Sequence, residues 1–250
     1  MKESGVSVIM AAFNGERFLD EQLASIIVQL REQDELIVVD DASTDKTGWI
    51  LRSWSVPQVQ VVRNAGNLGV RSSFELGLSL ARHRIVFLSD QDDVWLPGKR
   101  DAFAAAFAAA SDVSLVLSDV EVIDASGRTL APSFMAGRGG FKAGFLSNLV
   151  RNRFLGCAMA VHRRVLEVAL PIPSYVPQHD IWLGAIGTLT GSVRFLETPY
   201  LRYRRHDANL SPARPASPAR MIWWRVMLLA AVAARLTQRG PRDKKRAPTH

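Results

Sequence analysis

Four short apolar runs alternate with segments of helical spacing in the first part of the chain, and this alternation constrains the fold more than any other feature. The runs are rich in Val and Ile and have the length of buried parallel strands; they cover residues 6–12, 36–39, 59–62 and 85–88. Between them, apolar side chains recur every three or four positions, which predicts helices over 16–30, 44–54 and 71–82. This order favours right-handed βαβ units and an open, mostly parallel α/β sheet.

Polar residues follow each predicted strand. The four segments directly after the strands read FNGE (13–16), DDASTD (40–45), RNAGNLG (63–69) and SDQDD (89–93). Because the carboxyl ends of parallel strands meet at one edge of the sheet, where ligands bind, we expect these segments to form the functional site. The sequence has neither a G-x-G-x-x-G after its first strand nor a P-loop, which disfavours dinucleotide-binding and ATP-binding folds of those types.

The rest of the chain is predicted to continue the same domain. Residues 113–123 alternate loosely and reach a turn at 124–127, which indicates a strand and turn, or a hairpin. Gly and Pro become frequent over 131–144, which predicts an exposed loop. We further expect three elements and a linker, namely a strand over 157–162, a short helix over 165–170, a buried helix over 181–189 that opens after His179 and Asp180, and a Pro-rich linker over 212–218.

The charge of the chain is concentrated near its carboxyl end. The formal net charge is +7, and residues 220–250 carry eight Lys or Arg against the single acid Asp243, so residues 1–219 sum to zero. A nucleic-acid-binding core would need the basic excess on the folded part, and we therefore expect no nucleic-acid partner. The lone Cys157 excludes a disulfide framework and suits a reducing compartment.

The sequence also bears on location. The longest run without a charged residue, 181–193, is well short of the roughly 18–20 residues that a membrane span requires. The apolar stretch near the amino end covers only 6–13, which is too short for a signal peptide. We expect a cytoplasmic protein.

The acidic segment after the fourth strand predicts a cation site. Asp90 and Asp92 are two residues apart at a strand end, so their side chains point to the same face, and Asp93 follows in the turn. Carboxylates this close repel one another unless a cation lies among them, and hard oxygen ligands select Mg²⁺ or Mn²⁺. The alternative is a turn whose aspartates satisfy loop amides before a helix that starts near Pro97.

The acids after the second strand allow two interpretations. Asp41 at a strand end can accept hydrogen bonds from a nucleoside, as a strand-end acid does in dinucleotide folds. Alternatively, this segment only caps the next helix, with Ser43 or Thr44 as the N-cap and Asp45 in the first turn. Asn14 likewise fits either a ligand contact or a simple turn.

Taken together, these motifs resemble a known family. AAFNGE, VVDDASTD, NLGV and SDQDDVW, in this order and spacing, are similar to the donor half of a family 2 glycosyltransferase with the GT-A fold. In the second half, FLGCA (154–158), HDIWL (179–183) and YRRH (203–206) with Asn209 resemble the bacterial rhamnosyltransferase-like branch. The resemblance covers about residues 5–210.

The resemblance implies inverting transfer of a sugar from a nucleotide-diphospho-sugar donor. It assigns to the donor the residues Phe13, Asn14, Glu16, Asp41, Asn67, Asp90 and His206. Among these, Asp41 would hold the nucleoside, and Asp90 with Asp92 would form the D-x-D pair that binds metal and donor. His206 would lie beside the diphosphate or the metal, so the implied metal ligands are Asp92, Asp90 and His206.

The resemblance also assigns an acceptor side. Asp180 would be the catalytic base that takes the proton from the acceptor hydroxyl. Trp182 would pack against the acceptor, with His179 beside it. Each has a structural alternative: Asp180 as a helix cap, Trp182 as a core residue, His206 as a surface histidine. Phe13 stands where the family commonly has tyrosine, and the segment 206–209 departs from the usual Gly- and Asn-rich continuation.

The carboxyl-terminal segment predicts contact with a membrane surface. Residues 221–236 are apolar nearly all round, with Arg225 and Arg235 on a similar face because they are ten residues apart. Followed by RGPRDKKR, this resembles an interfacial helix with a polybasic anchor for anionic lipid. The alternative is a helix docked on the core of the domain, followed by a solvated end.

These inferences predict an organisation and a function. We expect a GT-A domain over 1–210, a linker over 211–219, and an apolar and basic segment over 220–250 whose residues 220–246 bind an anionic membrane surface. The predicted protein is a metal-dependent inverting glycosyltransferase, with a rhamnosyl donor as one reading, acting on a saccharide or lipid-linked saccharide in cell-surface polysaccharide synthesis. It would be peripheral on the inner face of the plasma membrane. The alternatives are a sugar nucleotidyltransferase and a non-catalytic membrane-associated nucleotide-sugar-binding protein.

Overall fold

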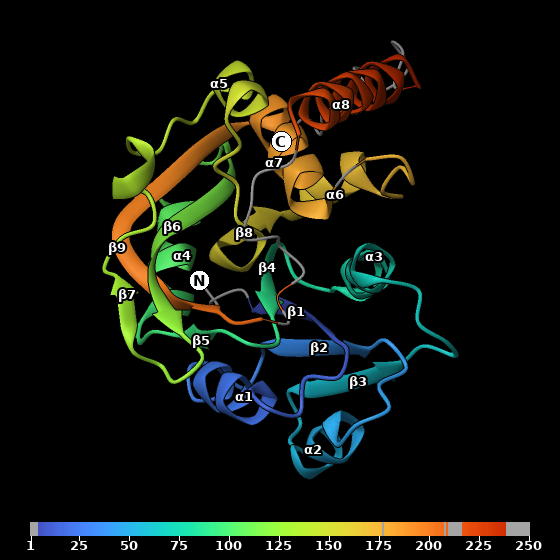
Figure 1. The fold of residues 1–250 in the computed structure, drawn as a ribbon, viewed down its shortest axis with the longest axis vertical. Helices are drawn as coiled ribbons and strands as arrows, with labels where there is room; N and C mark the ends of the chain where they lie inside the picture. Colours follow the sequence, from blue (N-terminus) through green and yellow to red (C-terminus); the bar gives the residue numbers. More distant parts are fainter. Residues whose placement is uncertain (1–4, 177, 208, 210–216, 239–250) are drawn as a thin grey trace, which may run out of the picture.

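The computed structural model describes residues 5–176, 178–207, 209 and 217–238, and within them a nine-stranded sheet runs through the molecule (Figure 1). The strand order is β3-β2-β1-β4-β8-β6-β9-β5, with β7 paired to β6. The strands are β1 (Val6–Ala12), β2 (Glu35–Asp40), β3 (Val59–Arg63), β4 (Ile85–Asp90), β5 (Val94–Trp95), β6 (Val113–Asp124), β7 (Thr129–Ala131), β8 (Met159–His162) and β9 (Ser192–Arg205).

Eight α-helices and two short 3-10 turns surround this sheet in the described residues. The helices are α1 (Leu19–Ile27), α2 (Thr47–Ser53), α3 (Val70–Leu80), α4 (Lys99–Ala108), α5 (Phe145–Val150), α6 (Arg163–Ala169), α7 (His179–Thr190) and α8 (Pro218–Gln238), and the turns are η1 (Ala136–Arg138) and η2 (Gly156–Ala158). The structure is therefore the single α/β domain that the alternating periods predict.

The strands β3, β2, β1 and β4 form a parallel half of the sheet. In this half, Ala12 is opposite Asp40, Asp40 is opposite Arg63, and Ala11 is opposite Asp90. The carboxyl ends of all four strands thus meet at one edge, as the sequence predicts.

Alternate side chains of the parallel strands enter two separate cores. Val8 and Met10 of β1 pack with apolar residues of α1, α2 and α4 on one face. Ile9 of β1 packs with residues of α3, α6 and α7 on the other face, which Figure 1 shows on the opposite side of the sheet. Because β1 and β2 are covered on both faces, they read as continuous apolar runs in the sequence.

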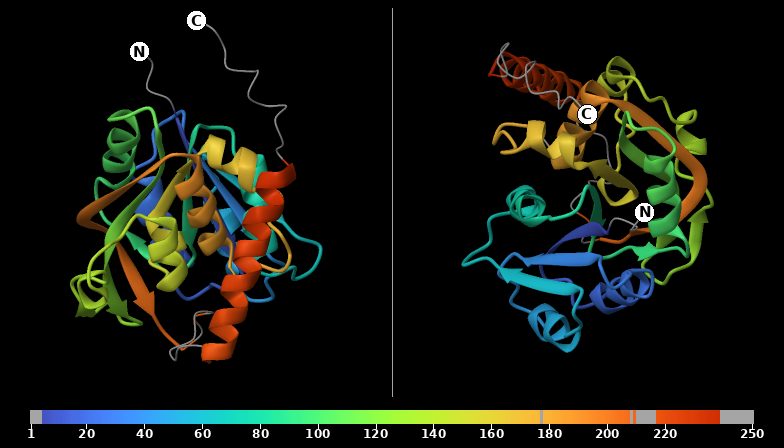
Figure 2. Two further views of the ribbon diagram at one scale, coloured as in Figure 1. Left: turned by 90° about the horizontal axis from the view of Figure 1, so that it is seen from above. Right: turned by 180° about the vertical axis from the view of Figure 1, so that it is seen from behind.

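The second half of the sheet curls, and this curl carries distant residues toward the strand ends. β9 runs parallel to β6, with irregularities in the register, and then pairs antiparallel with β5. Such irregularities bend and twist a strand, and Figures 1 and 2 show β9 wrapping around one side of the molecule. The parallel pairs still contain most of the paired residues of the sheet.

Most predicted elements in this half are present, with shifted bounds. The strand predicted over 113–123 is β6, and the turn predicted over 124–127 leads into β7. Because β6 pairs antiparallel with β7, the two strands form a hairpin. The strand predicted over 157–162 begins as the turn η2 and becomes β8 only at Met159. The helices predicted over 165–170 and 181–189 are α6 and α7, and the loop over 131–144 contains η1. The division into domain, linker and tail stays a prediction, because residues 210–216 and 239–250 lie outside the described part of the chain.

Helix α8 is docked on the domain along one face. Leu228, Ala231 and Val232 are buried in the core that also contains α6 and α7. Arg225 Nε donates to the carbonyl oxygen of Leu149 at 2.7 Å, and Arg235 Nη1 donates to that of Leu170 at 2.8 Å. The docked-helix alternative therefore describes this face.

The opposite face of α8 is apolar and exposed. Ile222, Trp223, Val226, Leu229 and Leu236 are between 42% and 59% exposed. No helix in the described residues combines the length and the apolar character that a membrane crossing requires.

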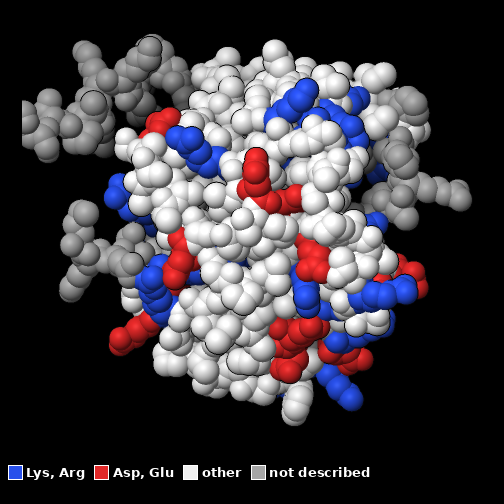
Figure 3. All heavy atoms as spheres, turned by 90° about the vertical axis from the view of Figure 1, so that its left-hand side faces the viewer, with Lys and Arg blue, Asp and Glu red and all other residues white. Residues whose placement is uncertain are grey.

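Charged side chains on the β7–β9 side of the molecule are mixed in sign. Figure 3 shows this side, where acidic and basic groups lie beside one another in several places among uncharged surface.

Candidate functional site

A cavity of about 980 Å³ lies at the carboxyl ends of the parallel strands. Its walls come from the ends of β1, β2, β4 and β9, the loop before α3, the turn η2 and the first turn of α7. Ten residues singled out in the sequence line it, namely Phe13, Asn14, Glu16, Asp41, Asn67, Asp90, Asp92, His179, Asp180 and His206. These residues, which lie far apart in the sequence, therefore line one cavity at the strand ends.

The carboxylate of Asp41 organises one end of this cavity. Its Oδ1 accepts hydrogen bonds from Asn64 Nδ2 at 2.7 Å and from the Leu68 amide at 2.9 Å, and its Oδ2 accepts from the Gly69 amide at 2.8 Å. Burial by itself raises the pKa of Asp41, but these donors hold it below its ordinary value. Asp41 is thus an ionised acid that shapes the loop 64–69 beside the cavity.

The capping interpretation of this segment is wrong in its detail. Helix α2 begins at Thr47, its N-cap is Lys46, and neither Ser43 nor Thr44 caps it. The Asn14 side chain explains part of the shift, because its Oδ1 accepts from the Thr44 amide at 2.8 Å. Asp45 is close to its predicted place, since its Oδ1 accepts from the Thr47 amide at 2.9 Å.

Side chains of the first loop mainly hold the second loop in place. Glu16 Oε2 accepts from the Lys46 amide at 2.9 Å, and the Glu16 amide donates to Asp45 at 3.0 Å. Asn14 and Glu16 therefore line the cavity while their polar atoms are used within the protein. The Phe13 ring, 42% exposed, is free to contact a ligand.

The sequence interpretation missed Gln91. Its Oε1 accepts from the Phe13 amide at 2.8 Å, and its Nε2 donates to the Phe13 carbonyl oxygen at 3.0 Å. The side chain thus ties the loop after β4 to the loop after β1, and places the Phe13 ring at the cavity. Its position inside D-x-D is the only signal in the sequence.

Asp92 and His206 meet at the centre of the cavity. His206 Nε2 lies 2.8 Å from Asp92 Oδ2, and Asn209 Nδ2 donates to the same oxygen at 3.1 Å. The residues are more than a hundred positions apart in the chain, and β9 brings them together by pairing with β5 next to Asp92 and Asp93. The surface-histidine alternative for His206 is wrong, because this ring is mostly buried against a carboxylate.

A second acidic group lies under this pair. Ligand atoms of Asp90, Asp93 and Cys157 lie within 4.8 Å of one another, whereas the predicted trio of Asp90, Asp92 and His206 is not a cluster at this spacing in the described residues. Asp93 is fully buried, its Oδ1 accepts from the Arg204 amide at 2.9 Å, and its Oδ2 accepts no hydrogen bond from an N–H or O–H group of the described residues, although the Cys157 thiol lies beside this carboxylate.

The electrostatics of these acids fit a cation. Burial, followed by the charges of Asp93 and Asp92, raises the pKa of Asp90 well above its ordinary value. Burial and the Asp92 charge raise the pKa of Asp93 to about 7. Negative charges that repel one another suit a hard divalent ion such as Mg²⁺ or Mn²⁺. The Cys157 thiol of the same cluster is not a ligand that such ions select, and the buried Lys99 ammonium offsets part of the negative charge. The Asp92 carboxylate, which also lines the cavity, fits the same ions.

Asp180 lies in the first turn of α7 and faces the cavity. The N-cap of α7 is Gln178, so Asp180 is not the N-cap residue, although its carboxylate does bind an amide of the first turn, in partial agreement with the helix-cap alternative. Its Oδ1 accepts from the Ile181 amide at 2.7 Å, and burial raises its pKa to about 6. A carboxylate with a pKa near the working pH can take up a proton from a ligand hydroxyl.

His179 packs inward beside it. Its ring stacks on Phe74 with centroids 4.1 Å apart, and burial lowers its pKa to about 4, so it is neutral at pH 7. Gly156 leaves room for both residues, because a Cβ there would lie 3.3 Å from the Asp180 Cβ and 3.4 Å from His179 Nε2.

The prediction that Trp182 packs against an acceptor is wrong. Trp182 is 0% exposed, and its indole N–H donates to the Ala169 carbonyl oxygen at 2.9 Å. Successive helical residues are about 100° apart, so Asp180 and Trp182 point in nearly opposite directions. Because Asp180 faces the cavity, Trp182 must face the core.

Arg204 is a further residue that the sequence interpretation missed. Its side chain is almost fully buried, its Nε donates to the Asp92 carbonyl oxygen at 2.8 Å, and its Nη2 donates to Glu21 at 2.6 Å. The guanidinium lies 4.7 Å from the Phe18 ring centroid, and that ring is in turn 4.8 Å from the His206 ring. Arg204 therefore connects the acidic loop, α1 and the end of β9.

The fold and cavity define a class: an α/β protein with an acid-lined ligand site at the strand ends. Residues 7–168 match the family described as "Glycosyl transferase family 2". The chain belongs to this family.

Individual relatives agree with this assignment. The chain is 28% identical over 216 residues to an uncharacterized glycosyltransferase of Nostoc sp., covering 82% of this chain and 66% of that protein. It is 24% identical over 181 residues to the UDP-Glc:alpha-D-GlcNAc-diphosphoundecaprenol beta-1,3-glucosyltransferase WfgD of Escherichia coli, covering 71% and 67%. The chain thus spans about two thirds of the length of these relatives.

A solved structure supports the fold. The Staphylococcus aureus protein TarS (residues 1–349), crystallised with UDP-GlcNAc, matches with a TM-score of 0.69 at 19% identity, over 93% of this chain and 66% of that one. The predicted GT-A fold is therefore confirmed.

Proposed function

We propose that this chain transfers a sugar, with inversion, from a nucleotide-diphospho-sugar to a hydroxyl of a saccharide or lipid-linked saccharide in the synthesis of cell-surface polysaccharide. The observation that carries the proposal is the meeting, in one cavity, of Asp41, the acids 90–93 with His206, and Asp180. Membership of family 2 supports it, as does similarity to WfgD, a beta-1,3-glucosyltransferase that uses UDP-Glc.

The donor would lie along the edge of the parallel half. Asp41 and the loop that it organises, including Asn67, would hold the nucleoside, and the Phe13 ring would stack on the base. Asn14 and Glu16 would act by keeping this end of the cavity in shape, since their polar atoms already bind the loop 44–46.

The diphosphate would lie against Asp92 and His206, next to Asp90. These residues would hold Mg²⁺ or Mn²⁺, which when bound neutralises the charge of the leaving diphosphate. The buried Asp93 keeps negative charge beneath them, and Arg204 keeps the loop in place.

Asp180 would act as the base. Its carboxylate takes the proton of the acceptor hydroxyl while the hydroxyl oxygen attacks the anomeric carbon from the side opposite the diphosphate. The bond between that carbon and the phosphate oxygen breaks, and its electron pair leaves with the nucleoside diphosphate. The neutral His179 beside Asp180 would position the acceptor.

An Asp180→Asn variant tests this role. Asparagine has nearly the same shape but cannot take a proton, so we expect transfer to fall by roughly 10²–10⁴-fold. Titration of the nucleoside diphosphate by calorimetry should give a dissociation constant close to that of the original protein. Near-normal transfer by the variant would show that Asp180 is not the base.

We further propose that the sugar of the donor is rhamnose. A rhamnosyl donor is favoured only by the motifs at 154–158, 179–183 and 203–206. A thermal-shift comparison of UDP, GDP and dTDP, each with and without Mn²⁺, would identify the nucleobase of the donor. Stabilisation by UDP alone would count against a dTDP-linked rhamnose.

We also propose that the exposed face of α8 rests on the cytoplasmic membrane surface. Its apolar residues, among them Trp223 and Val226, have no cover in the described part of the chain. Arg220 and the basic residues 239–246, which lie outside the described residues, would contact anionic headgroups. This position would bring a lipid-linked acceptor near the enzyme.

A further inference from the structure

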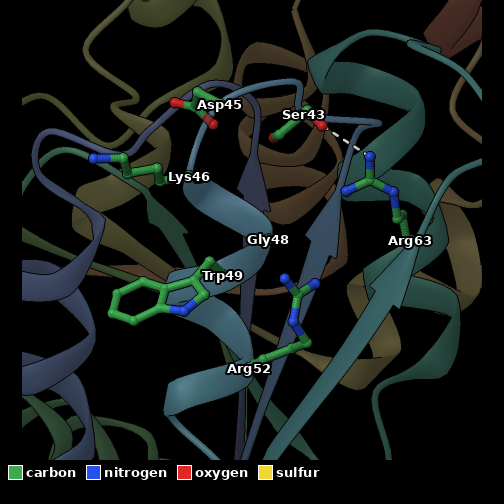
Figure 4. Close-up of a pocket in the computed structure, with 7 residues that line it drawn as sticks. All are labelled: Ser43, Asp45, Lys46, Gly48, Trp49, Arg52 and Arg63. Atoms are coloured by element: carbon green, nitrogen blue, oxygen red, sulfur yellow. Dashed lines mark hydrogen bonds between the residues drawn. The ribbon is translucent and has the colours of Figure 1, made fainter.

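A second cavity, which we call the outer cavity, opens between α2 and the edge strand β3 (Figure 4). It has a volume of about 690 Å³ and is lined by Ser43, Asp45, Lys46, Gly48, Trp49, Arg52 and Arg63. Of these residues, only Asp45 also lines the cavity at the carboxyl ends of the parallel strands, which we call the donor cavity. A volume of this order is typical of small-molecule sites.

Trp49 supplies a flat apolar wall. Its side chain projects from α2 and is 65% exposed, although its neighbours Ile50 and Leu51 in the same helix are buried in the core. Exposure of an indole forgoes its favourable burial. Figure 4 shows the ring on one side of Gly48 and the guanidinium groups of Arg52 and Arg63 on the other.

The two guanidinium groups converge over the floor of the outer cavity. A Cβ at Gly48 would lie 3.4 Å from Arg63 Nη1 and 3.6 Å from Arg52 Nη1. Because Gly48 has no side chain, this space between the two positive groups is open to a ligand. The same Cβ would lie 3.8 Å from Asp40 Oδ2, which is buried beneath and pairs with Arg63 Nη1, while Arg63 Nη2 donates to the Ser43 carbonyl oxygen. An anionic group there would contact Arg52 directly and the exposed side of the Arg63 guanidinium.

The two acids near the outer cavity, Asp40 and Asp45, already have hydrogen-bond or ion-pair partners within the protein. Asp40 pairs with Arg63 and accepts from the Ser43 amide at 2.9 Å. Asp45 accepts from the amides of Glu16 and Thr47. In the described residues, the Arg52 side chain makes no hydrogen bond and no ion pair, so its charge is available to an anion.

We propose that the outer cavity binds an anionic sugar residue of a glycan. The face of the sugar ring would pack on the Trp49 indole, and a carboxylate or phosphate on the ring would lie over Gly48 between Arg52 and Arg63. Guanidinium groups bind both kinds of anion through paired hydrogen bonds. The choice of a saccharide rests on the proposed function, in which the acceptor is a glycan, and the outer cavity would hold that glycan away from the reacting end.

The test is direct binding observed at Trp49. Tetragalacturonate is titrated into the full chain with the donor cavity filled by UDP and Mn²⁺, and the indole N–H signal of Trp49, identified by its loss in Trp49→Phe, is followed by NMR. Maltotetraose tests the sugar without the charge, glucose 6-phosphate tests the phosphate source, and inorganic phosphate tests the charge without the sugar.

We expect tetragalacturonate or glucose 6-phosphate to shift the Trp49 signal, and maltotetraose and inorganic phosphate to bind more weakly. An Arg52→Gln variant should weaken binding by about fivefold, as expected for loss of one exposed charge pair. The matched variant Arg194→Gln, an exposed arginine on β9, should bind as the original protein does.

Three results would overturn the proposal: no shift of Trp49 with either charged sugar at millimolar concentration, unchanged binding in Arg52→Gln, or equal binding of maltotetraose. Because the measurement does not use sugar transfer, loss of the proposed enzymatic function would leave its outcome unaffected.

Discussion

Single residues in this protein act through partners that lie far away in the sequence. Arg204 is the clearest case, because one buried side chain contacts the acidic loop, Glu21 and the Phe18 ring. The proposed cation site would thus depend on a residue that does not itself bind the cation. Residues that orient metal ligands in this way commonly affect metal affinity when they are changed.

An Arg204→Met variant tests this positioning role. Methionine keeps much of the apolar bulk but removes the bonds to Asp92 and Glu21, so we expect the dissociation constant of Mn²⁺ to rise by about tenfold. Binding is measured by electron paramagnetic resonance of free Mn²⁺. Arg204→Lys should recover part of the affinity, since it keeps one donor.

The matched control is Arg202→Met on the same strand, whose arginine pairs with Glu121 at 3.1 Å. It should bind Mn²⁺ like the original protein. If Arg204→Met also bound Mn²⁺ normally, or if both variants lost affinity equally, the positioning role would be refuted.

Trp182 shows at the same scale what local reasoning could have supplied. Once Asp180 is placed in the cavity, helical geometry alone turns Trp182 to the core. Asp41 and Asp90 were predictable because they end strands. Gln91 and Arg204 were not, since their partners Phe13 and Asp92 are brought to them only by the folded sheet.

Among the elements, helix starts were harder to predict than strands. The apolar runs identify β1 to β4 because strands buried on both faces leave a continuous signal. The start of α2 was misplaced because the Thr44 amide is bound by Asn14, thirty residues earlier. Local capping rules do not include a partner at that distance.

Helix α8 has one face that is buried against the domain and one apolar face that is exposed. Its inner face, with Leu228 and Val232, belongs to the core, whereas Trp223 and Val226 are exposed. We expect Trp223→Glu with Val226→Glu to reduce co-sedimentation with phosphatidylglycerol vesicles by roughly fivefold or more, because both charges enter the membrane interface. The thermal midpoint should change little, since neither side chain is buried.

Phosphatidylcholine vesicles are the control for charge, and Leu229→Glu tests a third position on the exposed face. If the double variant sedimented as well as the original protein, α8 would not be the membrane contact. Equal binding to neutral vesicles would count against the anionic surface.

In the molecule as a whole, the buried acids couple stability to pH and to divalent cations. Burial and the charge of Asp92 raise the pKa of Asp93 to about 7 from an ordinary value of 3.8. A carboxyl with a raised pKa in the folded state favours folding while protonated, and this contribution is lost as pH rises through the folded value. Lys99, whose pKa burial lowers to about 8, remains mostly charged until the upper end of this range.

We therefore expect the chelator-treated protein to melt roughly 2 °C lower at pH 8 than at pH 6.5. Added Mn²⁺ should reverse most of the loss at pH 8, because a cation offsets the ionised carboxylates. Differential scanning calorimetry measures both effects.

An Asp93→Asn variant should show a smaller pH dependence in chelator, and the exposed control Asp101→Asn should not differ from the original protein. A thermal midpoint that stays constant from pH 6.5 to 8 without cations would contradict this account.

Because β9 is near the carboxyl end of the chain, the proposed cation site would be completed late in synthesis and folding. Asp92 is synthesised long before His206, and the two meet only when the end of β9 has taken its place beside β5. An incomplete or wrongly threaded polypeptide would thus hold the acids without the imidazole. Tight binding of the ion would therefore require that β9 has folded, so the protein would become able to bind the ion only when its sheet is complete.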